Sequence, residues 1–249
     1  MNLLVDIGNT RVKWCFSEGD VCYGFGVLEN AVLSEKRIDE VIAGKDIEKI
    51  LLSNVGKSEV SRMFGQVAEK RGLQFFAIES RREIAGVKFS YPDIARLGVD
   101  RCLAMVAAYK NKGVLVIDAG SAITADYLDD DGYHLGGYIL PGCQMLLGSL
   151  NSGTSRIEVD VLAGISTPGK STEECVGNGL ALMLHSIMKS FVDMAASYGI
   201  EEFVVTGGDA EVLVEACPAV TFIRRANLVL DGLLKIQAEI EGGKGVGAL

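Results

Sequence analysis

Short apolar runs that end in polar turns alternate along the chain with longer segments in which apolar residues recur every three or four positions. The first run, Leu3-Leu4-Val5, meets the polar segment Asp6 to Thr10. Beyond it Val12, Trp14 and Phe16 alternate with Arg11, Lys13 and Cys15. Alternation with a period of two is typical of a strand, so the pattern predicts a β-hairpin with a polar tip.

The same arrangement returns 112 residues later, where residues 114 to 117 run into Asp118 to Ala122 and an extended pattern follows over residues 123 to 127. A third apolar run, residues 203 to 205, ends in Thr206-Gly207-Gly208-Asp209. Helical periodicity covers residues 97 to 109, 172 to 196 and 228 to 241. We therefore expect an α/β chain of two similar halves, with domains at residues 1–110 and 111–249.

The two polar tips have side chains that suit a nucleotide. We expect Gly8 and Gly120 to adopt positive φ, which would turn backbone amides inward as an anion-binding concavity. Asp6 can hold Mg²⁺ through water, and Asn9 and Thr10 can donate hydrogen bonds. A single tip of this kind is also what an ordinary tight turn looks like. Two copies at matching places favour a nucleotide site.

Charge and composition narrow the partners. The chain has 24 Lys and Arg against 33 Asp and Glu, a formal net charge of −9, which disfavours nucleic acid and anionic membranes. Six cysteines without a C-x-x-C pair and two histidines give no support for a Cys/His metal site. The apolar run at residues 3 to 5 is too short for a signal peptide, and residues 180 to 192 are too short for a membrane span. We expect a cytoplasmic protein with reduced thiols, and a buried helix at residues 180 to 192.

The three polar elements, taken in order, resemble the two phosphate hairpins and the glycine pair of the acetate and sugar kinase, Hsp70 and actin superfamily. They are Asp6 to Thr10, Asp118 to Ser121, and Gly207-Gly208-Asp209. This resemblance implies two ribonuclease-H-like domains with a nucleotide cleft between them, in which ATP binds.

Within that superfamily the chain resembles the type III pantothenate kinases over nearly its whole length. The segments that carry the resemblance are residues 6 to 13, Tyr91 with 97 to 101, 118 to 124, 136 to 142 and 169 to 172. The Gly-x-Asp-Arg segment, Gly98 to Arg101, is the most specific. The resemblance implies transfer of the ATP γ-phosphate to pantothenate at the start of coenzyme A synthesis, with Mg²⁺ and a monovalent cation, K⁺ or NH₄⁺.

The same resemblance assigns roles to individual residues. It makes Asp100 the catalytic proton acceptor, Asp118 a ligand of the monovalent cation and Asp6 a partner of Mg²⁺ through water. The chain would form a homodimer whose substrate pocket is completed at the interface by Thr172 of the partner subunit. The residues assigned to ATP are Asp6, Ile7, Gly8, Asn9, Thr10, Arg11, Val12, Lys13, Ser121, Gly207 and Gly208, and those assigned to pantothenate are Tyr91, Gly98, Val99, Asp100, Arg101 and Thr172.

The chain departs from the family pattern in two places. Ser121 stands where threonine is usual, which keeps the hydroxyl. Pro92 follows Tyr91, and Ile94 stands where the family often has its proline, so the pocket wall is expected to differ there.

Other interpretations of these residues stay open. An aspartate before an apolar helix is commonly an N-cap, which is the alternative for Asp100. Arg101 could be a solvated surface arginine instead of a partner for the pantothenate carboxylate.

Residues 164 to 171 match the P-loop pattern and follow an alternating segment at residues 157 to 161. However, the strand at 203 to 205 ends in Thr206-Gly207-Gly208, without the aspartate that would hold Mg²⁺ in a P-loop enzyme. Another small-molecule kinase of the superfamily, or a nucleotide-binding regulator without turnover, remains possible.

Overall fold

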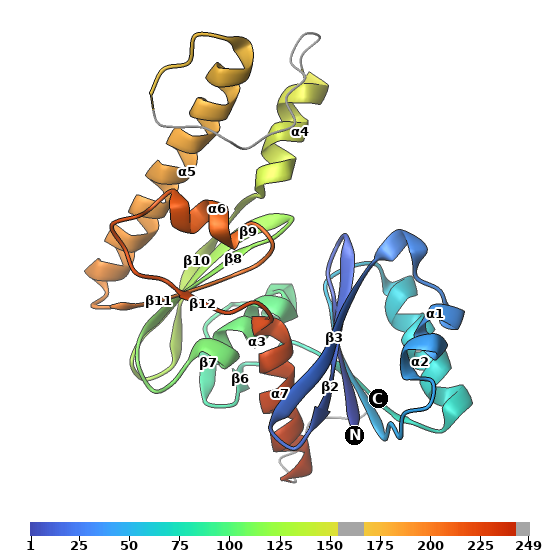
Figure 1. Cartoon of the computed structure of the whole chain (residues 1–249). Helices are drawn as coiled ribbons and strands as arrows, with labels where there is room; N and C mark the ends of the chain where they lie inside the picture. Colours follow the sequence, from blue (N-terminus) through green and yellow to red (C-terminus); the bar gives the residue numbers. More distant parts are fainter. Residues whose placement is uncertain (154–166, 243–249) are drawn as a thin grey trace. The chain divides into compact units, whose positions relative to one another are not determined.

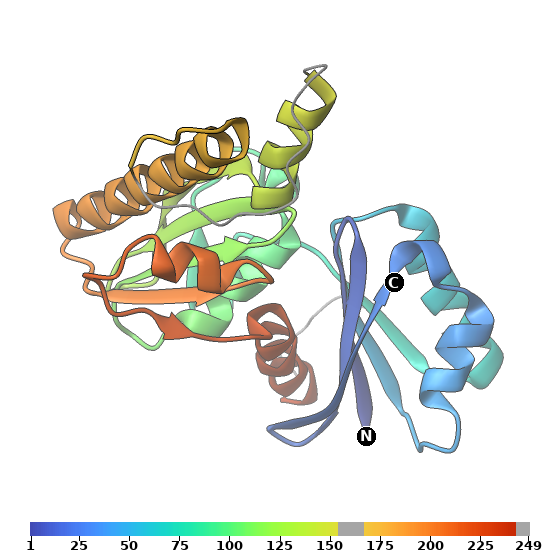
Figure 2. The same ribbon diagram turned by 45° about the horizontal axis from the view of Figure 1, so that its top comes forward.

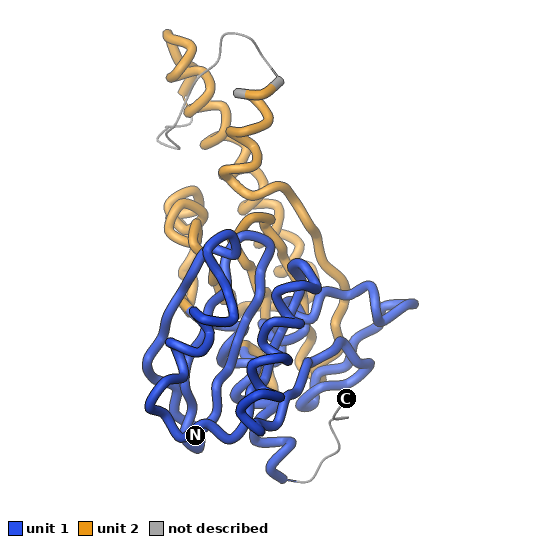
Figure 3. Tube along the Cα trace, turned by 90° about the vertical axis from the view of Figure 1, so that its right-hand side faces the viewer, with its two compact units in different colours: residues 1–107, 227–249 blue, residues 108–226 orange. Residues whose placement is uncertain are grey.

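The computed structural model describes residues 1–153 and 167–242, and the chain divides into two compact units (Figure 3). The first unit consists of Met1–Ala107 and Asn227–Leu249, and the second of Ala108–Ala226. The division expected after residue 110 differs from this grouping at the C-terminus. There the last helix, α7 (Leu228–Glu241), belongs with the first unit because it packs on strands of that unit.

The first unit is built on a five-stranded sheet in the order β3-β2-β1-β4-β5. Strand β1 pairs antiparallel with β2 and parallel with β4, so the predicted hairpin at the start of the chain is confirmed. The strands are β1 (Asn2–Ile7), β2 (Arg11–Glu18), β3 (Val21–Glu29), β4 (Lys49–Asn54) and β5 (Gln74–Ile78). The 3₁₀ turn η1 (Asn30–Val32) and helices α1 (Glu35–Ile42) and α2 (Ser58–Arg71) complete this part of the unit.

Both faces of this sheet are covered, which explains why β1 is apolar on both sides. Leu3, Val5 and Ile7 pack in one core cluster with side chains of α1 and α2. Leu4 shares the opposite face with Asn2, on the side where α7 packs (Figure 1). A strand buried on two faces is expected to lack polar alternation, as β1 does before Asp6.

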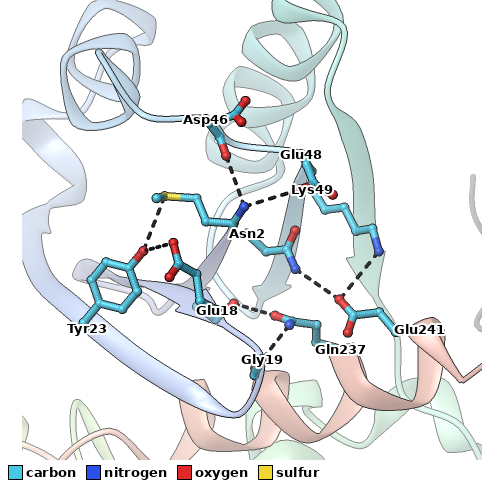
Figure 4. Close-up of polar contacts among 11 residues, drawn as sticks. Asn2, Glu18, Gly19, Tyr23, Asp46, Glu48, Lys49, Gln237 and Glu241 are labelled. Carbon is cyan, nitrogen blue, oxygen red and sulfur yellow. Dashed lines mark hydrogen bonds and ion pairs between the residues drawn. The ribbon is translucent and has the colours of Figure 1, made fainter.

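Polar contacts join α7 to residues of β1, β2 and β4 (Figure 4). The hydroxyl of Ser17 donates to Oε1 of Gln237 at 2.5 Å, and both residues are buried. Near the helix end, Asn2 donates to the Glu241 carboxylate at 3.4 Å, and Lys49 lies 3.7 Å from it. Buried polar groups with partners fix the position of a packed helix, because leaving either group unpaired would cost free energy.

Three short elements and one helix follow β5 in the first unit, and the helix runs to the boundary with the second unit. They are β6 (Glu83–Ile84), which pairs antiparallel with β7 (Val87–Phe89), the 3₁₀ turn η2 (Ile94–Arg96), and α3 (Val99–Ala108). The helix predicted from residue 97 therefore begins two residues later. Lys235 of α7 donates to the carbonyl of Val106 at 2.7 Å, which joins α7 to the last turn of α3.

The second unit repeats the strand plan of the first, position for position. Within a seven-stranded sheet, the five strands of this unit lie in the order β12-β11-β8-β9-β10, with β8 antiparallel to β9 and parallel to β11. They are β8 (Val114–Ala119), β9 (Ala122–Leu128), β10 (Tyr133–Pro141), β11 (Glu202–Thr206) and β12 (Ile223–Arg224). The helices are α4 (Cys143–Gly153), α5 (Thr172–Ser197) and α6 (Ala210–Glu215). The predicted α/β chain of two similar halves is confirmed.

Helix α5 is longer than the buried segment predicted at residues 180 to 192, and it is buried along one side only. Leu184, Met188 and Phe191 pack into the core with residues of β8 and β9, and Figure 2 shows the helix lying along that sheet. Within the described residues, α5 is the one helix long and apolar enough to cross a membrane, with a mean hydropathy of 1.2 over 18 residues. Its packing into the core makes it a core helix with an exposed apolar side.

Candidate active site

The first tip joins β1 to β2 and presents the residues assigned to phosphate. Asp6 is half-buried on β1 next to Ile7, and Asn9 and Thr10 are exposed at the turn. The amide of Gly8 donates to the carbonyl of Arg11 at 3.0 Å and so closes the hairpin. Gly8 does not have a positive φ, so that prediction was wrong. Because the amide of Gly8 donates within its own turn, the hairpin closes without the left-handed backbone conformation.

The second tip, between β8 and β9, is closed in a similar way. Asp118 is half-buried near the end of β8, and Ser121 is exposed at the turn. The amide of Gly120 donates to the carbonyl of Ala122 at 3.0 Å, and Gly120 likewise lacks a positive φ, contrary to expectation. Neither glycine therefore turns its amide toward a phosphate in the way the sequence suggested. What the tips share is a carboxylate at the strand end and exposed polar side chains at the turn.

A second glycine lies against each tip. A Cβ on Gly56 would sit 2.6 Å from the carbonyl oxygen of Gly8, and one on Gly142 would sit 2.3 Å from that of Gly120. A side chain at either position would push the tip out of place. Sequence reasoning missed Gly56, and only its position just after an apolar strand, β4, could have marked it.

Asn30 also holds the first tip and was not anticipated. Its side-chain amide donates to the carbonyls of Gly8 at 2.9 Å and Asn9 at 3.0 Å. Its own backbone amide donates to the carbonyl of Thr10 at 2.9 Å. Three carbonyls of one turn are thus hydrogen-bonded by one asparagine, which supports the shape of the tip.

The glycine pair abuts the second tip, as its assignment requires. Gly207 has φ +98°, and a Cβ there would lie 2.3 Å from the carbonyl oxygen of Ala119 and 2.6 Å from Oδ1 of Asp118. The amide of Asp209 donates to the same Ala119 carbonyl at 2.9 Å. Gly208, by contrast, has open space around it. The turn after β11 therefore packs against the end of β8.

One thiol beside this turn is a neutral packing group. Cys143 is buried at the start of α4, and its pKa is raised to about 11, first by burial and then by the carboxylate of Asp209. The thiol stays protonated at neutral pH, because the charged thiolate would be poorly solvated and would face a like charge. It therefore contributes no negative charge beside the second tip.

Five of the residues assigned to pantothenate, Tyr91 and Gly98 to Arg101, lie in the first unit, whereas Thr172 lies in the second. Arg101 is only 6% exposed, and its Nη1 donates to the hydroxyl of Tyr91 at 3.2 Å. The same guanidinium lies 5.9 Å from the centre of the Tyr91 ring. The alternative of a solvated surface arginine is therefore wrong. Burial of a guanidinium with a fixed aromatic partner is costly unless a ligand or a protein group uses its charge.

Asp100 lies inside the first turn of α3, because the helix begins at Val99. Its Oδ1 accepts a hydrogen bond from the amide of Arg101 at 2.8 Å. Gly98 lies beside the carboxylate, where a Cβ would be 2.5 Å from Oδ1. Asp100 is thus one residue past the helix start, which departs from the simple N-cap alternative, and its half-buried carboxylate is held in one orientation.

Two residues that sequence reasoning missed hold this segment in place. Arg82 donates to the carbonyls of Tyr91 at 3.2 Å and Pro92 at 3.1 Å. Ser80 donates to the carbonyl of Leu97 at 2.6 Å. Both ends of the loop that joins Tyr91 to the Gly-x-Asp-Arg segment are therefore hydrogen-bonded to residues 80–82. Pro92, at one of the two departures from the family pattern, is among the residues held in this way.

Thr172 is the first residue of α5 and lines a groove of about 810 Å³ together with Leu150, Val176 and Met183. The hydroxyl of Ser171 caps the helix by accepting from the amide of Glu174 at 3.2 Å. The amide of Lys170 donates to the carboxylate of Glu174 at 2.7 Å. The end of the P-loop pattern is thus a helix cap, while its residues 164–166 and the predicted strand at 157–161 lie outside the described residues.

The carboxylates present fit a lightly held Mg²⁺. In the described part of the chain, no group of three or more His, Cys, Asp or Glu residues is placed to hold a metal ion. Mg²⁺ is usually bound by one or two carboxylates, with water and substrate phosphates completing its shell. Asp6, at the end of β1 beside the exposed turn, fits that role, and no cage of protein ligands is needed.

Comparison with known proteins agrees with this arrangement. The chain is 36% identical over 243 residues to a type III pantothenate kinase of Marinobacter nauticus, covering 95% of this chain and 98% of the relative. It is 33% identical over 241 residues to that of Azotobacter vinelandii, covering 92% and 95%.

Solved structures show the same fold at low identity. A putative Baf family transcriptional activator from Campylobacter jejuni has a TM-score of 0.64 at 22% identity, with 96% of this chain and 99% of that chain covered. A ROK family glucokinase from Streptomyces griseus has a TM-score of 0.51 at 11% identity, with 94% and 98% covered. The kinase neighbour supports the two ribonuclease-H-like domains expected from the sequence. The family model described as type III pantothenate kinase matches residues 2–194, and the chain belongs to that family.

Proposed function

We propose that this chain transfers the γ-phosphate of ATP to the hydroxyl of pantothenate, giving 4′-phosphopantothenate. The observation that carries the proposal is the cluster of Asp100, Arg101 and Tyr91, in which a buried guanidinium and a fixed carboxylate stand side by side at the start of α3. The clustering supports an acceptor site for a small molecule that has both a carboxylate and a hydroxyl.

Arg101 binds the pantothenate carboxylate in this proposal. A guanidinium offers a planar fork of donors that matches a carboxylate, and the Tyr91 hydroxyl and ring restrict its rotation. Low exposure strengthens the interaction, because less water competes for the charge. The substrate is thereby oriented from its carboxylate end.

Asp100 accepts the proton of the pantothenate hydroxyl. Phosphoryl transfer depends mainly on positioning and on stabilising charge, since the transition state is loose and the acceptor proton leaves late. A carboxylate held by the Arg101 amide has the fixed orientation this role requires. Asp100 therefore aligns the hydroxyl first and takes its proton as the new phosphorus–oxygen bond forms.

The phosphate groups of ATP are bound by residues of the two tips. Asp6 holds Mg²⁺ through water, while Arg11 and Lys13 on β2 supply positive charge near the turn. Ser121 donates its exposed hydroxyl from the second tip. The Gly207-Gly208 turn provides backbone without side chains on the adenosine side.

A monovalent cation, K⁺ or NH₄⁺, is proposed at Asp118. A bare carboxylate next to a phosphate tip repels a triphosphate, and a bound cation offsets that repulsion. Asp118 is half-buried between the paired Thr124 and Thr206, where screening by water is weaker than at the surface.

The chain is further proposed to act as a homodimer, in which Thr172 completes the substrate pocket of the partner subunit. Support comes from the apolar surface around α4 and α5, where Met145 is 55% exposed and Leu182 is 52% exposed. Both helices meet through a small apolar cluster beside the groove that Thr172 lines. A second copy of the chain would cover this surface. We place the enzyme in the cytoplasm.

The test is a coupled assay of purified protein with ATP, Mg²⁺, K⁺ and pantothenate, run beside a panel of sugars and small carboxylates. We expect turnover with pantothenate, and Asp100→Asn should lose most of it, by about 10²-fold or more, with ATP affinity kept. Phosphorylation of another acceptor alone would instead indicate a different kinase of the superfamily. ATP binding without any turnover would indicate a regulator. Near-wild-type turnover of Asp100→Asn would remove the proton-acceptor role and leave the kinase assignment standing.

A further inference from the structure

Two cysteines of the first unit lie close together in a place that the kinase mechanism does not use. The sulfur of Cys15 on β2 lies 3.2 Å from the sulfur of Cys22 on β3, and both are free thiols. A disulfide has a sulfur–sulfur length of about 2.05 Å. A movement of roughly 1 Å by the two side chains would therefore bring the sulfurs to bonding distance.

The local strand geometry explains why the two sulfurs meet. Strands β2 and β3 are antiparallel neighbours, with Ser17 opposite Cys22 and Trp14 opposite Gly26. The register shifts between Trp14 and Phe16, which marks an irregularity at Cys15. Cys15 and Ser17 share one face of β2, so Cys22 is the diagonal neighbour of Cys15. Diagonal neighbours on paired strands are within side-chain reach of each other.

The two thiols differ in exposure and in charge. Cys15 is fully buried, whereas Cys22 is half-buried and can be reached by a small solute. The Cys15 thiol donates its hydrogen bond to the Cys22 sulfur, which lowers the pKa of Cys22 and raises that of Cys15. The carboxylate of Asp231 on α7 opposes the charged form of both. Cys22 is thus the attacking sulfur and Cys15 the resolving one.

We propose that Cys15 and Cys22 form a reversible disulfide site whose oxidant is a hydroperoxide. The Cys22 thiolate attacks the terminal peroxide oxygen, the oxygen–oxygen bond breaks, and the leaving oxygen takes a proton to depart as an alcohol or water. Cys22 is then a sulfenic acid. The Cys15 sulfur attacks the Cys22 sulfur, the sulfur–oxygen bond breaks, and the oxygen leaves as water with the Cys15 proton. Two thiols are oxidised by two electrons as one peroxide is reduced, and an added dithiol reverses the change.

The cross-link would act on an edge strand. Strand β3 is the last strand of the first sheet, and Val21, Phe25 and Val27 on it are each more than half exposed. Exposed apolar edge strands are prone to pairing with other chains once they loosen. A disulfide to β2 keeps β3 in place under oxidising stress. The resolving thiol next to Cys22 also prevents its further oxidation to the sulfinic acid.

The test uses the full chain with a small excess of hydrogen peroxide, followed by blocking of free thiols and peptide mapping. Trypsin leaves both cysteines in the peptide of residues 14 to 36, which should become lighter by two hydrogen atoms. Cleavage after Glu18 should then give two peptides joined through Cys15 and Cys22 and separable by dithiothreitol. We expect Cys175→Ser, which removes the exposed cysteine, to form the same link.

A quantitative readout compares the wild-type chain with a single variant. In the wild-type chain, Cys22 should lose reactivity toward iodoacetamide after peroxide treatment and regain it after reduction, while Cys175 stays outside the cross-link. Reduced Cys22→Ser should keep wild-type kinase activity and form no internal link. The proposal is overturned if Cys22 collects sulfinic acid without a link, if only links through Cys175 form, or if neither thiol changes.

Discussion

Replacing Gly207 with alanine should damage the second unit far more than the same change one residue later. Gly207 has φ +98°, and its Cβ would lie 2.3 Å from the Ala119 carbonyl oxygen and 2.6 Å from Oδ1 of Asp118. A non-glycine residue held in a sparsely populated backbone region costs about 1–3 kcal/mol. Overpacking against backbone atoms that must shift adds about 1–3 kcal/mol. We therefore expect Gly207→Ala to lose roughly 2–6 kcal/mol of unfolding free energy.

Gly208 supplies the matched control. No atom lies within 4 Å of a Cβ there, and its φ is outside the left-handed region. Gly208→Ala should stay within about 0.5 kcal/mol of the wild-type unfolding free energy. If adenosine lies against this turn, the added methyl group should raise the KM for ATP in Gly208→Ala while stability is unchanged.

The assay is urea unfolding followed by circular dichroism for the three proteins, together with their KM for ATP. A protein with a stability of about 10 kcal/mol, in the middle of the ordinary range, stays folded after the expected loss, so the kinetics of Gly207→Ala can be measured. Because the methyl group presses on Asp118 and Ala119, ATP use should fall as well. Equal stability of Gly207→Ala and Gly208→Ala would refute the reasoning from close contact and backbone conformation.

Three further predictions follow from the proposed roles. Activity should be low in Na⁺ or tetramethylammonium and recover in K⁺ or NH₄⁺, and equal rates in all four would remove the cation from Asp118. Arg82→Met should raise the KM for pantothenate by about 3–10-fold, because it removes two hydrogen bonds to the carbonyls of Tyr91 and Pro92. The KM for ATP should stay unchanged, and Arg82→Lys should restore part of the pantothenate KM. A larger effect on the KM for ATP would contradict this prediction. The variants Asp100→Asn and Thr172→Arg should each be inactive alone. When they are unfolded and reassembled together, half the dimers are mixed and each mixed dimer has one intact site. The mixture should therefore regain about a quarter of wild-type activity. No recovery, with mixed dimers verified by mass spectrometry, would place both residues in one subunit's site.

The elements that the sequence predicted well are those whose pattern is local. The period of the apolar residues predicts the two hairpins, β11, α5 and α7. The polar residues that follow the apolar runs predict the tips. The predicted conformation of Gly8 and Gly120 failed because a sequence does not say which amide will close a turn. A glycine can adopt a positive φ, but the hydrogen bonds that close each turn hold its backbone in another conformation.

The supporting residues could not be predicted because they lie outside the motifs that they hold in place. Asn30 reaches Gly8, and Gly56 lies against the same carbonyl, although neither belongs to the tip. Arg82 acts on Tyr91 through two main-chain carbonyls, for which side-chain patterns give no signal. Residues that bind the ligand can be found by motif, whereas residues that hold the backbone of a motif depend on the tertiary fold.

The position of α7 also sets the order in which the chain can fold during synthesis. The second unit is continuous in sequence, so it can form as soon as residue 226 has left the ribosome. The first unit, although its sheet is synthesised earlier, cannot complete its core until α7 emerges after the whole of the second unit. Until then one face of β1, β2 and β4 has no covering helix. A stop codon before residue 228 would therefore disable the half of the protein that was made first.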